Sequence, residues 1–235
     1  MDKERSNITK TFITIIIIIL FTLGVLAIMN FYNLIPKEYF KASDFNIKSI
    51  YSKKDFDGDK IDDYTDFVLG ARKDAENHPT YISKYYDDAY PPSNEGVCTD
   101  VIWRAFKNSG YSLRDMMHYD ITNNLSDYKE IKNPDNNIDF RRVVNQEVFF
   151  QKYGIELTLD LEKIEEWQPG DIVFIENSHV GIISDKRRKD GIPYVIHNSG
   201  QPIREEDYLT KRKITGHYRF DATKVPKELL IPWKQ

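Results

Sequence analysis

The sequence has one cysteine among its 235 residues, so no disulfide bridge can form within the chain. It also lacks a long run of basic residues, and its formal net charge is −4 at pH 7. Proteins that bind nucleic acids present a basic face, so this charge balance argues against a nucleic-acid partner. A domain built from this chain must be stable without disulfide bridges, and its single thiol is left for another role.

Charged residues are also absent from positions 11–36, which include the apolar run Ile15–Phe21. About two dozen apolar residues, at about 1.5 Å each, span a hydrocarbon core of about 30 Å with some tilt. The basic residues before this stretch, Lys3, Arg5 and Lys10, are also typical of a secretory signal peptide. The apolar stretch is long for a signal peptide, and no small-x-small cleavage pattern follows it. We therefore expect an uncleaved single-pass anchor in the cell membrane.

The orientation of this anchor follows less directly from the charges, because lysines flank it on both sides. We expect residues 1–10 to be a cytoplasmic tail and the folded part to be extracytoplasmic, mainly because the function inferred below requires it. Residues 37–79 then form a tether, an acidic loop and a leading helix.

The acidic loop has the spacing of a calcium-binding loop. Carboxylates occupy positions one, three, five, nine and twelve of the pattern, which are Asp55, Asp57, Asp59, Asp63 and Asp66. Two features depart from that pattern: Lys60 replaces the usual glycine at position six, and an aspartate replaces the usual glutamate at position twelve. The alternative is a solvated acidic loop whose last aspartates cap a helix over residues 67–77. Any calcium bound here would be structural, and no other cofactor is required.

The single cysteine, Cys98, lies where an amphipathic helix begins. Val101, Ile102, Ala105 and Phe106 recur at helical spacing, and the sequence Asn-Ser-Gly at 108–110 is typical of a helix end. A thiol at a helix amino terminus faces unpaired N–H groups and the positive end of the helix dipole, which favour the reactive thiolate. The alternative is that Cys98 is a small buried core residue, as most free cysteines are.

After this helix the pattern changes from helical to extended. Short helices are expected around residues 113–118 and before Gly154, and strands are expected at 172–175, 179–184, 194–198 and 214–220. Helices followed by an antiparallel sheet make an α+β domain. His179 and His197 both lie at ends of neighbouring strands, where side chains approach within about 5 Å. A helix-initial thiol followed by two such histidines is the nucleophile, base and orienting group of nucleophilic catalysis.

The order of these motifs resembles the papain-like cell-wall hydrolases of the NlpC type. The resemblance is closer to a bacterial branch, domain of unknown function 1287, through the blocks GVCTDVIWRAF, NIDFRRV, QPGDIVF, HVGIISD, VIHN and ITGHYRF. It covers about residues 80–221, which we expect to be the catalytic domain, with residues 222–235 as a C-terminal tail. The fold that it implies is a papain-like domain in which the cysteine helix packs on an antiparallel sheet.

The resemblance implies that Cys98 is the nucleophile, His179 the base and His197 the orienting residue, with Asn198 as the rival for the third role. Family members often place an oxyanion-binding tyrosine about a dozen residues before the cysteine, which points to Tyr86, with Tyr90 as second choice. Arg141 is a further candidate, because an arginine can hold a substrate carboxylate, although it can equally be paired within the structure.

These features predict a membrane-anchored cysteine hydrolase, an amidase or endopeptidase that cleaves peptide bonds in peptidoglycan through a thioester. The run GVCTD differs from the aspartate-cysteine-serine-glycine run usual in these hydrolases, which leaves the substrate class open. Two alternatives remain. The same residues would serve an acyltransferase or thioesterase acting on lipid or other acyl donors, and a catalytically inert wall-binding module would not use the thiol.

Overall fold

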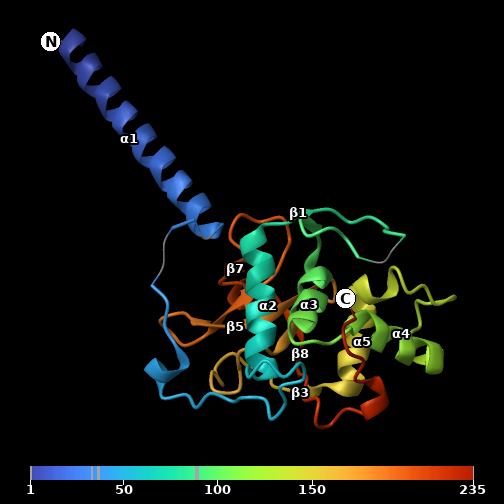
Figure 1. The fold of residues 1–235 in the computed structure, drawn as a ribbon. Helices are drawn as coiled ribbons and strands as arrows, with labels where there is room; N and C mark the ends of the chain where they lie inside the picture. The colour runs from blue at the N-terminus through green and yellow to red at the C-terminus, as the bar shows by residue number, and fades with distance from the viewer. Residues whose placement is uncertain (1, 33, 36–37, 88–89, 235) are drawn as a thin grey trace. The chain divides into compact units, whose positions relative to one another are not determined.

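A computed structural model describes residues 2–32, 34–35, 38–87 and 90–234. The chain divides into two compact units, Met1–Lys37 and Glu38–Gln235. The first contains helix α1 (Asp2–Phe31), whose stretch Lys10–Phe31 is long and apolar enough to cross a membrane (Figure 1). The expected apolar helix is therefore present. Helix α1 also includes most of the expected cytoplasmic tail, residues 1–10. The expected boundary between the membrane anchor and the tether, at positions 36 and 37, lies outside the described residues.

The second unit is α+β, as predicted. Its α-helices are α2 (Asp63–Asn77), α3 (Cys98–Asn108), α4 (Leu113–Asn123) and α5 (Val143–Tyr153). The main sheet is antiparallel, with the order β3 (Ile155–Glu156), β8 (Ile214–Arg219), β4 (Ile172–Ile175), β5 (His179–Arg187), β6 (Pro193–Ile196) and β7 (Glu205–Glu206). A separate parallel pair joins β1 (Thr80–Tyr81) to β2 (Glu95–Gly96). Short 3₁₀ turns are η1 (Ala42–Phe45), η2 (Leu125–Asp127), η3 (Asp139–Arg141), η4 (Leu209–Lys211) and η5 (Lys227–Leu229).

The larger core lies between the helices and one face of the sheet. Helices α2 and α3 lie side by side in front of the strands (Figure 1), and their rings Phe67 and Phe106 stack with centroids 4.4 Å apart. Gly70 permits this close packing, because a Cβ atom there would lie 2.6 Å from Asn108 Cβ. Ile182 of β5 belongs to the same core. The sheet and α2 thus hold α3, and with it Cys98, in one position.

The opposite face of the sheet is also covered. A second buried cluster consists of Trp167, Val173, Ile175, Ile183, Val195 and Leu209. Successive residues of a strand point to opposite faces, so Val173 enters this cluster while Phe174 enters the larger core. Burial on both faces explains why residues 172–175 form an uninterrupted apolar run.

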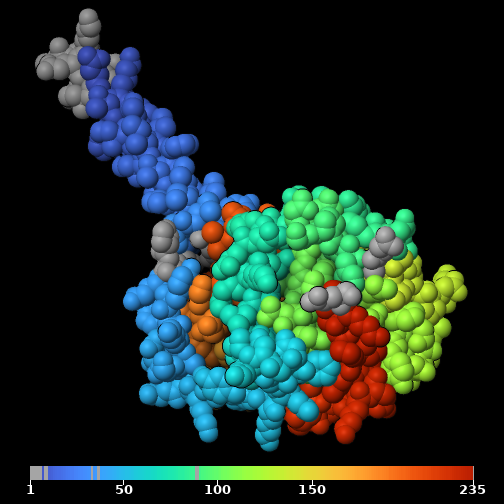
Figure 2. Space-filling model, viewed as in Figure 1, coloured from blue at the N-terminus to red at the C-terminus, as the bar shows by residue number. Residues whose placement is uncertain are grey.

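The compact unit extends beyond residues 80–221, the segment expected to be the catalytic domain. The predicted tether segment contains α2, whose Phe67 is fully buried in the larger core. The predicted C-terminal tail contributes Leu229 to the same core, and the backbone N–H of Trp233 donates to Gly110 O at 2.7 Å. Figure 2 shows the cyan residues of the acidic loop beside the red C-terminal segment. Both flanking segments bury apolar side chains, so the folded unit extends over Glu38–Gln235.

Candidate active site

Cys98 is the first residue of α3, as predicted, and it is 4% exposed. The backbone N–H groups of Val180 and Thr99 lie near its sulfur and lower the pKa of the thiol. Burial has the larger effect and raises the pKa of the Cys98 thiol to about 11. The helix start thus favours the thiolate in the expected direction, but packing against β5 removes the sulfur from water and outweighs that effect, as the alternative of a buried cysteine predicts.

The first turn of α3 is fixed by a buried ion pair. The Asp100 carboxylate accepts from the Val97 backbone N–H at 2.7 Å and from Trp103 Nε1 at 2.7 Å. Arg141 adds a bidentate pair, with Nε and Nη2 at 2.7 and 2.9 Å from the two Asp100 oxygens. The Arg141 side chain is 2% exposed. Its guanidinium is thus paired within the structure, which is the second of the two roles considered from the sequence, rather than open to a substrate carboxylate. Arg141 instead holds the turn that carries Cys98.

His179 and His197 meet across β5 and β6, as predicted. Nε2 of His179 lies 2.9 Å from Nδ1 of His197, and the two rings are perpendicular. Gly181 makes room for this arrangement, since a Cβ atom there would lie 3.1 Å from His197 Cβ. Burial lowers the pKa of each imidazole to about 3, so both rings are neutral at pH 7.

The cysteine and the histidine pair are linked through the start of β5. His179 is the first residue of that strand, and the backbone N–H of the next residue, Val180, lies near enough to the Cys98 sulfur to lower the pKa of its thiol. Because Nε2 of His179 is bonded to His197, Nδ1 is the nitrogen available to take a proton from the thiol. A neutral thiol and a neutral imidazole can act together by transferring the proton between them as the reaction begins.

Asn198, the rival for the third role, is turned away from the histidines. Its amide nitrogen donates to Gly96 O at 3.2 Å, and its oxygen accepts from Gly200 N at 3.0 Å and from Arg204. It ties the loop after β6 to the backbone just before Cys98. The position bonded to His179 is therefore that of His197.

The tyrosines chosen from the sequence are occupied elsewhere. The Tyr86 hydroxyl donates to Glu95 at 2.6 Å, and the Tyr90 ring packs 4.6 Å from Trp103 and 4.9 Å from Trp233. Tyr81 is instead the tyrosine near the thiol. Burial is the largest cause that raises the pKa of the Tyr81 hydroxyl, and repulsion from a Cys98 thiolate at high pH is the next. Sequence reasoning missed Tyr81 because its place depends on the two-residue pairing of β1 with β2, where it lies opposite Gly96.

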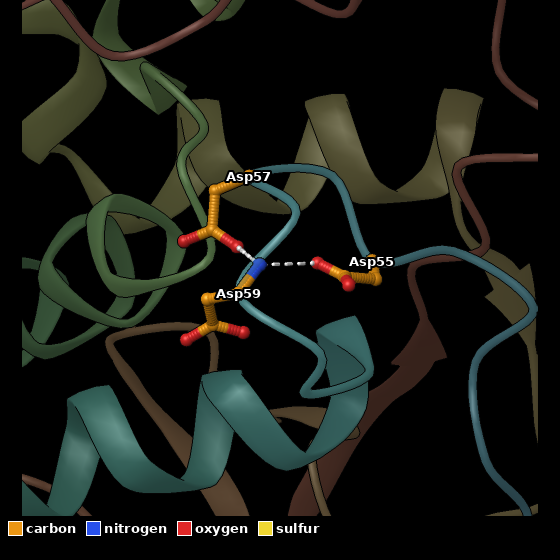
Figure 3. Close-up of side chains that lie close together, drawn as sticks. All are labelled: Asp55, Asp57 and Asp59. Atoms are coloured by element: carbon orange, nitrogen blue, oxygen red, sulfur yellow. Dashed lines mark hydrogen bonds between the residues drawn. The ribbon is translucent and has the colours of Figure 1, made fainter.

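The acidic loop gathers three of its five predicted ligands. Carboxylate oxygens of Asp55, Asp57 and Asp59 lie within 4.8 Å of one another. Figure 3 shows the Asp59 backbone nitrogen between the Asp55 and Asp57 side chains, to which it donates at 3.1 and 3.3 Å. Lys60 adopts a positive φ of 78°, the conformation that the usual glycine would supply.

The other two predicted ligands point into the protein. Asp63 accepts from Phe56 N at 3.0 Å and from the Tyr111 hydroxyl at 2.7 Å, and Asp66 accepts from Asn108 Nδ2 at 3.0 Å. Calcium takes six to eight oxygen ligands. The five carboxylates predicted as ligands therefore do not gather around one point. The alternative, in which an aspartate of this loop caps the following helix, is seen at Asp62, whose side chain accepts from Tyr64 N.

Residues 68–220, which contain this site, match the model of a family described as "Domain of unknown function (DUF1287)". The chain is also 37% identical over 149 residues to the "Uncharacterized protein YijF" of Escherichia coli (strain K12), which covers 60% of this chain and 72% of YijF. No solved structure gives a significant match.

Proposed function

This chain belongs to the DUF1287 family, and from that premise we propose that it is a membrane-anchored cysteine hydrolase that cleaves amide bonds in peptidoglycan. The observation that carries the proposal is the contact between the Cys98 sulfur and the start of β5, where His179 is bonded to His197. This arrangement supports a likeness to the NlpC-type papain-like hydrolases in the order and the roles of the three side chains.

The proposed reaction has two halves. Nδ1 of His179 takes the Cys98 proton while the sulfur attacks the substrate carbonyl, and His179 then gives that proton to the departing amine. The product of this half is a thioester on Cys98. His179 next takes a proton from water, the hydroxide attacks the thioester, and the proton returns to the sulfur as the acid leaves.

The charge on the carbonyl oxygen needs donors nearby. The backbone N–H of Cys98, at the start of α3, is one candidate. The second is the hydroxyl of Tyr81, a β1 residue that pairs with Gly96 of β2. The raised pKa of Tyr81 keeps its hydroxyl protonated at neutral pH, as a donor must be.

The location follows from the substrate. Helix α1 would anchor the chain, and the unit Glu38–Gln235 would lie on the extracytoplasmic side, where peptidoglycan is found. The hydrolysis proceeds without a cofactor, and calcium at the loop Asp55–Asp59 would stabilise the fold rather than take part in the reaction.

Digestion of purified peptidoglycan by the full chain in detergent tests this function. Mass analysis should show new amine and carboxyl ends with the wild type and none with Cys98→Ala, which leaves the fold in place because the lost atom is one sulfur. Asn108→Ala, on the same helix but outside the site, should release the same fragments as the wild type. Uncut peptidoglycan together with transfer from lipid or other acyl donors would reject the proposal in favour of an acyltransferase.

A further inference from the structure

We propose that Glu206, a residue that the sequence did not single out, is a positioning residue that sets the tautomer of both histidines. Its Oε1 lies 3.2 Å from Nε2 of His197, whose other nitrogen is bonded to His179. The chain of contacts therefore runs from Glu206 through His197 to His179. The inference rests on the proposed function for its catalytic meaning, but not for its geometry.

Strand register explains why these side chains share one face. Val195 of β6 lies opposite Glu206 of β7, and residues opposite each other point to the same face. His197 follows Val195 by two residues, and its backbone N–H continues the ladder by donating to Arg204 O at 2.9 Å. The Glu206 carboxylate is thus brought diagonally to the His197 ring, and both residues are buried.

Counting hydrogens along the chain assigns each nitrogen. An ionised carboxylate can only accept, so Nε2 of His197 must carry the hydrogen. A neutral His197 then has a bare Nδ1, which accepts the Nε2 hydrogen of His179. A neutral His179 is left with a bare Nδ1, the nitrogen that the proposed reaction needs as base. The carboxylate of Glu206 therefore determines, through His197, which nitrogen of His179 is basic.

The groups around this chain of contacts are consistent with that assignment. Lys211 Nζ lies 4.0 Å from the second Glu206 oxygen and adds a positive charge that favours the carboxylate. Gln201 Nε2 lies 3.2 Å from both Nδ1 and Nε2 of His197, so its amide hydrogens can be accepted by whichever nitrogen is bare and allow the assignment without deciding it. The Tyr208 ring packs 4.1 Å from the His197 ring and limits its rotation.

The assignment also affects the charged state of the base. When His179 takes the thiol proton, its imidazolium is bonded at Nε2 to His197, and Nε2 of His197 lies 3.2 Å from the Glu206 carboxylate. A negative charge at the far end of a hydrogen-bond chain favours the protonated base. Loss of this charge should therefore slow every step in which His179 takes a proton.

Glu205 is a matched control on the same strand. It is the other glutamate of β7 and is partly buried, and its carboxylate is bonded to Arg72, Ser184 and Lys186 rather than lying against a histidine. Glu205→Gln removes the same charge, one residue away, without touching the histidines.

The test is histidine NMR on the full chain in detergent micelles, with ¹⁵N-labelled imidazoles, together with the iodoacetamide alkylation rate of Cys98 at pH 7.5. We expect hydrogen on Nε2 of both rings in the wild type. Glu206→Gln keeps an oxygen acceptor, so it should keep these tautomers but slow alkylation about tenfold, the effect of losing one charge-assisted bond. Glu206→Leu should change the His197 tautomer, and Glu205→Gln should change neither measurement.

Hydrogen on Nδ1 of His179 in the wild type would overturn the proposal, and this reading needs no variant to fold. An alkylation rate unchanged in Glu206→Gln would also overturn it, because a merely structural role is preserved by that variant. Neither reading depends on peptidoglycan. Expected tautomers in a protein that cuts no peptidoglycan would reject the proposed substrate and keep the role of Glu206.

Discussion

At the scale of single residues, the account depends on a thiol and an imidazole that are both neutral at rest. Burial raises the pKa of Cys98 to about 11 and lowers that of His179 to about 3. The sequence places the cysteine at a helix start, and from that position alone a lowered thiol pKa was expected. The strand that covers the sulfur lies about eighty residues further along the chain, so no local pattern could reveal the burial.

This neutral pair predicts a specific pH dependence for alkylation of Cys98. Because the thiol and His179 keep one resting protonation state between about pH 3 and pH 11, the iodoacetamide rate that His179 assists should be flat from pH 5 to pH 9 and should rise only as the pH approaches 11. Intact-mass measurement of the alkylated fraction gives this rate, and the ultraviolet absorbance of the thiolate, which should be absent at pH 7, gives the resting state. Thiolate absorbance already present at pH 7 would indicate a preformed thiolate–imidazolium pair and would contradict the neutral assignment.

The buried carboxyl of Asp66 predicts an effect on stability. Burial, with the neighbouring aspartates, raises its pKa from 3.8 to about 7, so the folded state binds the proton more tightly than the unfolded state. Its contribution to stability is therefore full below pH 4 and is lost as the pH rises through 7. Asp66→Asn keeps the oxygen that accepts from Asn108 but cannot ionise, so this variant should not lose stability as the pH rises through 7.

Urea unfolding in EDTA should accordingly show Asp66→Asn more stable than the wild type at pH 8 by about 1–3 kcal/mol, and no more stable at pH 4. Asp62→Asn, the neighbouring helix cap, keeps a capping oxygen and should show no such pH dependence. An Asp66→Asn variant that is less stable at both pH values would contradict the raised pKa.

At the scale of elements, the amphipathic pattern of α3 and the apolar strands β4 and β5 could be read from the sequence, because each is set by local periodicity. The strands β1 and β7 could not, since two residues have no period. Tyr81 and Glu206, the site residues that sequence reasoning missed, lie on these two strands. The partner of Arg141 was missed for a related reason: Asp100 is 41 residues away in the chain.

The Arg141–Asp100 pair predicts a large loss of stability on removal of the arginine. Arg141→Ala leaves the fully buried Asp100 charge without its cation, which should cost about 3–5 kcal/mol in the free energy of unfolding. Arg142→Ala, at the exposed neighbouring position, should cost less than about 0.5 kcal/mol. Urea denaturation followed by circular dichroism measures both. Equal effects of the two substitutions would place Arg141 outside the support of the cysteine turn.

At the scale of the whole molecule, the α+β class and the order of helices before strands could be predicted, because both follow from the sequence of local patterns. The extent of the folded unit could not, since the charged residues around α2 and the proline-containing C-terminal segment resemble linkers. The contacts of Phe67 and Leu229 with the core show that both segments are integral.

This extent predicts how truncated chains behave. Residues 38–235 should unfold in one cooperative transition, whereas residues 80–221 should show no cooperative transition, because they expose the surfaces that α2 and the C-terminal segment cover. Thermal unfolding followed by circular dichroism separates the two results. A cooperative transition of the shorter chain would show that the flanking segments are accessory.

The claim on which the whole account depends is that the Cys98 sulfur becomes the acyl carrier. Its most direct measurement is the intact mass of the full chain, quenched in acid during reaction with peptidoglycan fragments. The account predicts a mass increase equal to one acyl fragment, located on Cys98 and removed by hydroxylamine, and no increase in Cys98→Ala. Fragment release that continues in Cys98→Ala without any adduct would contradict it.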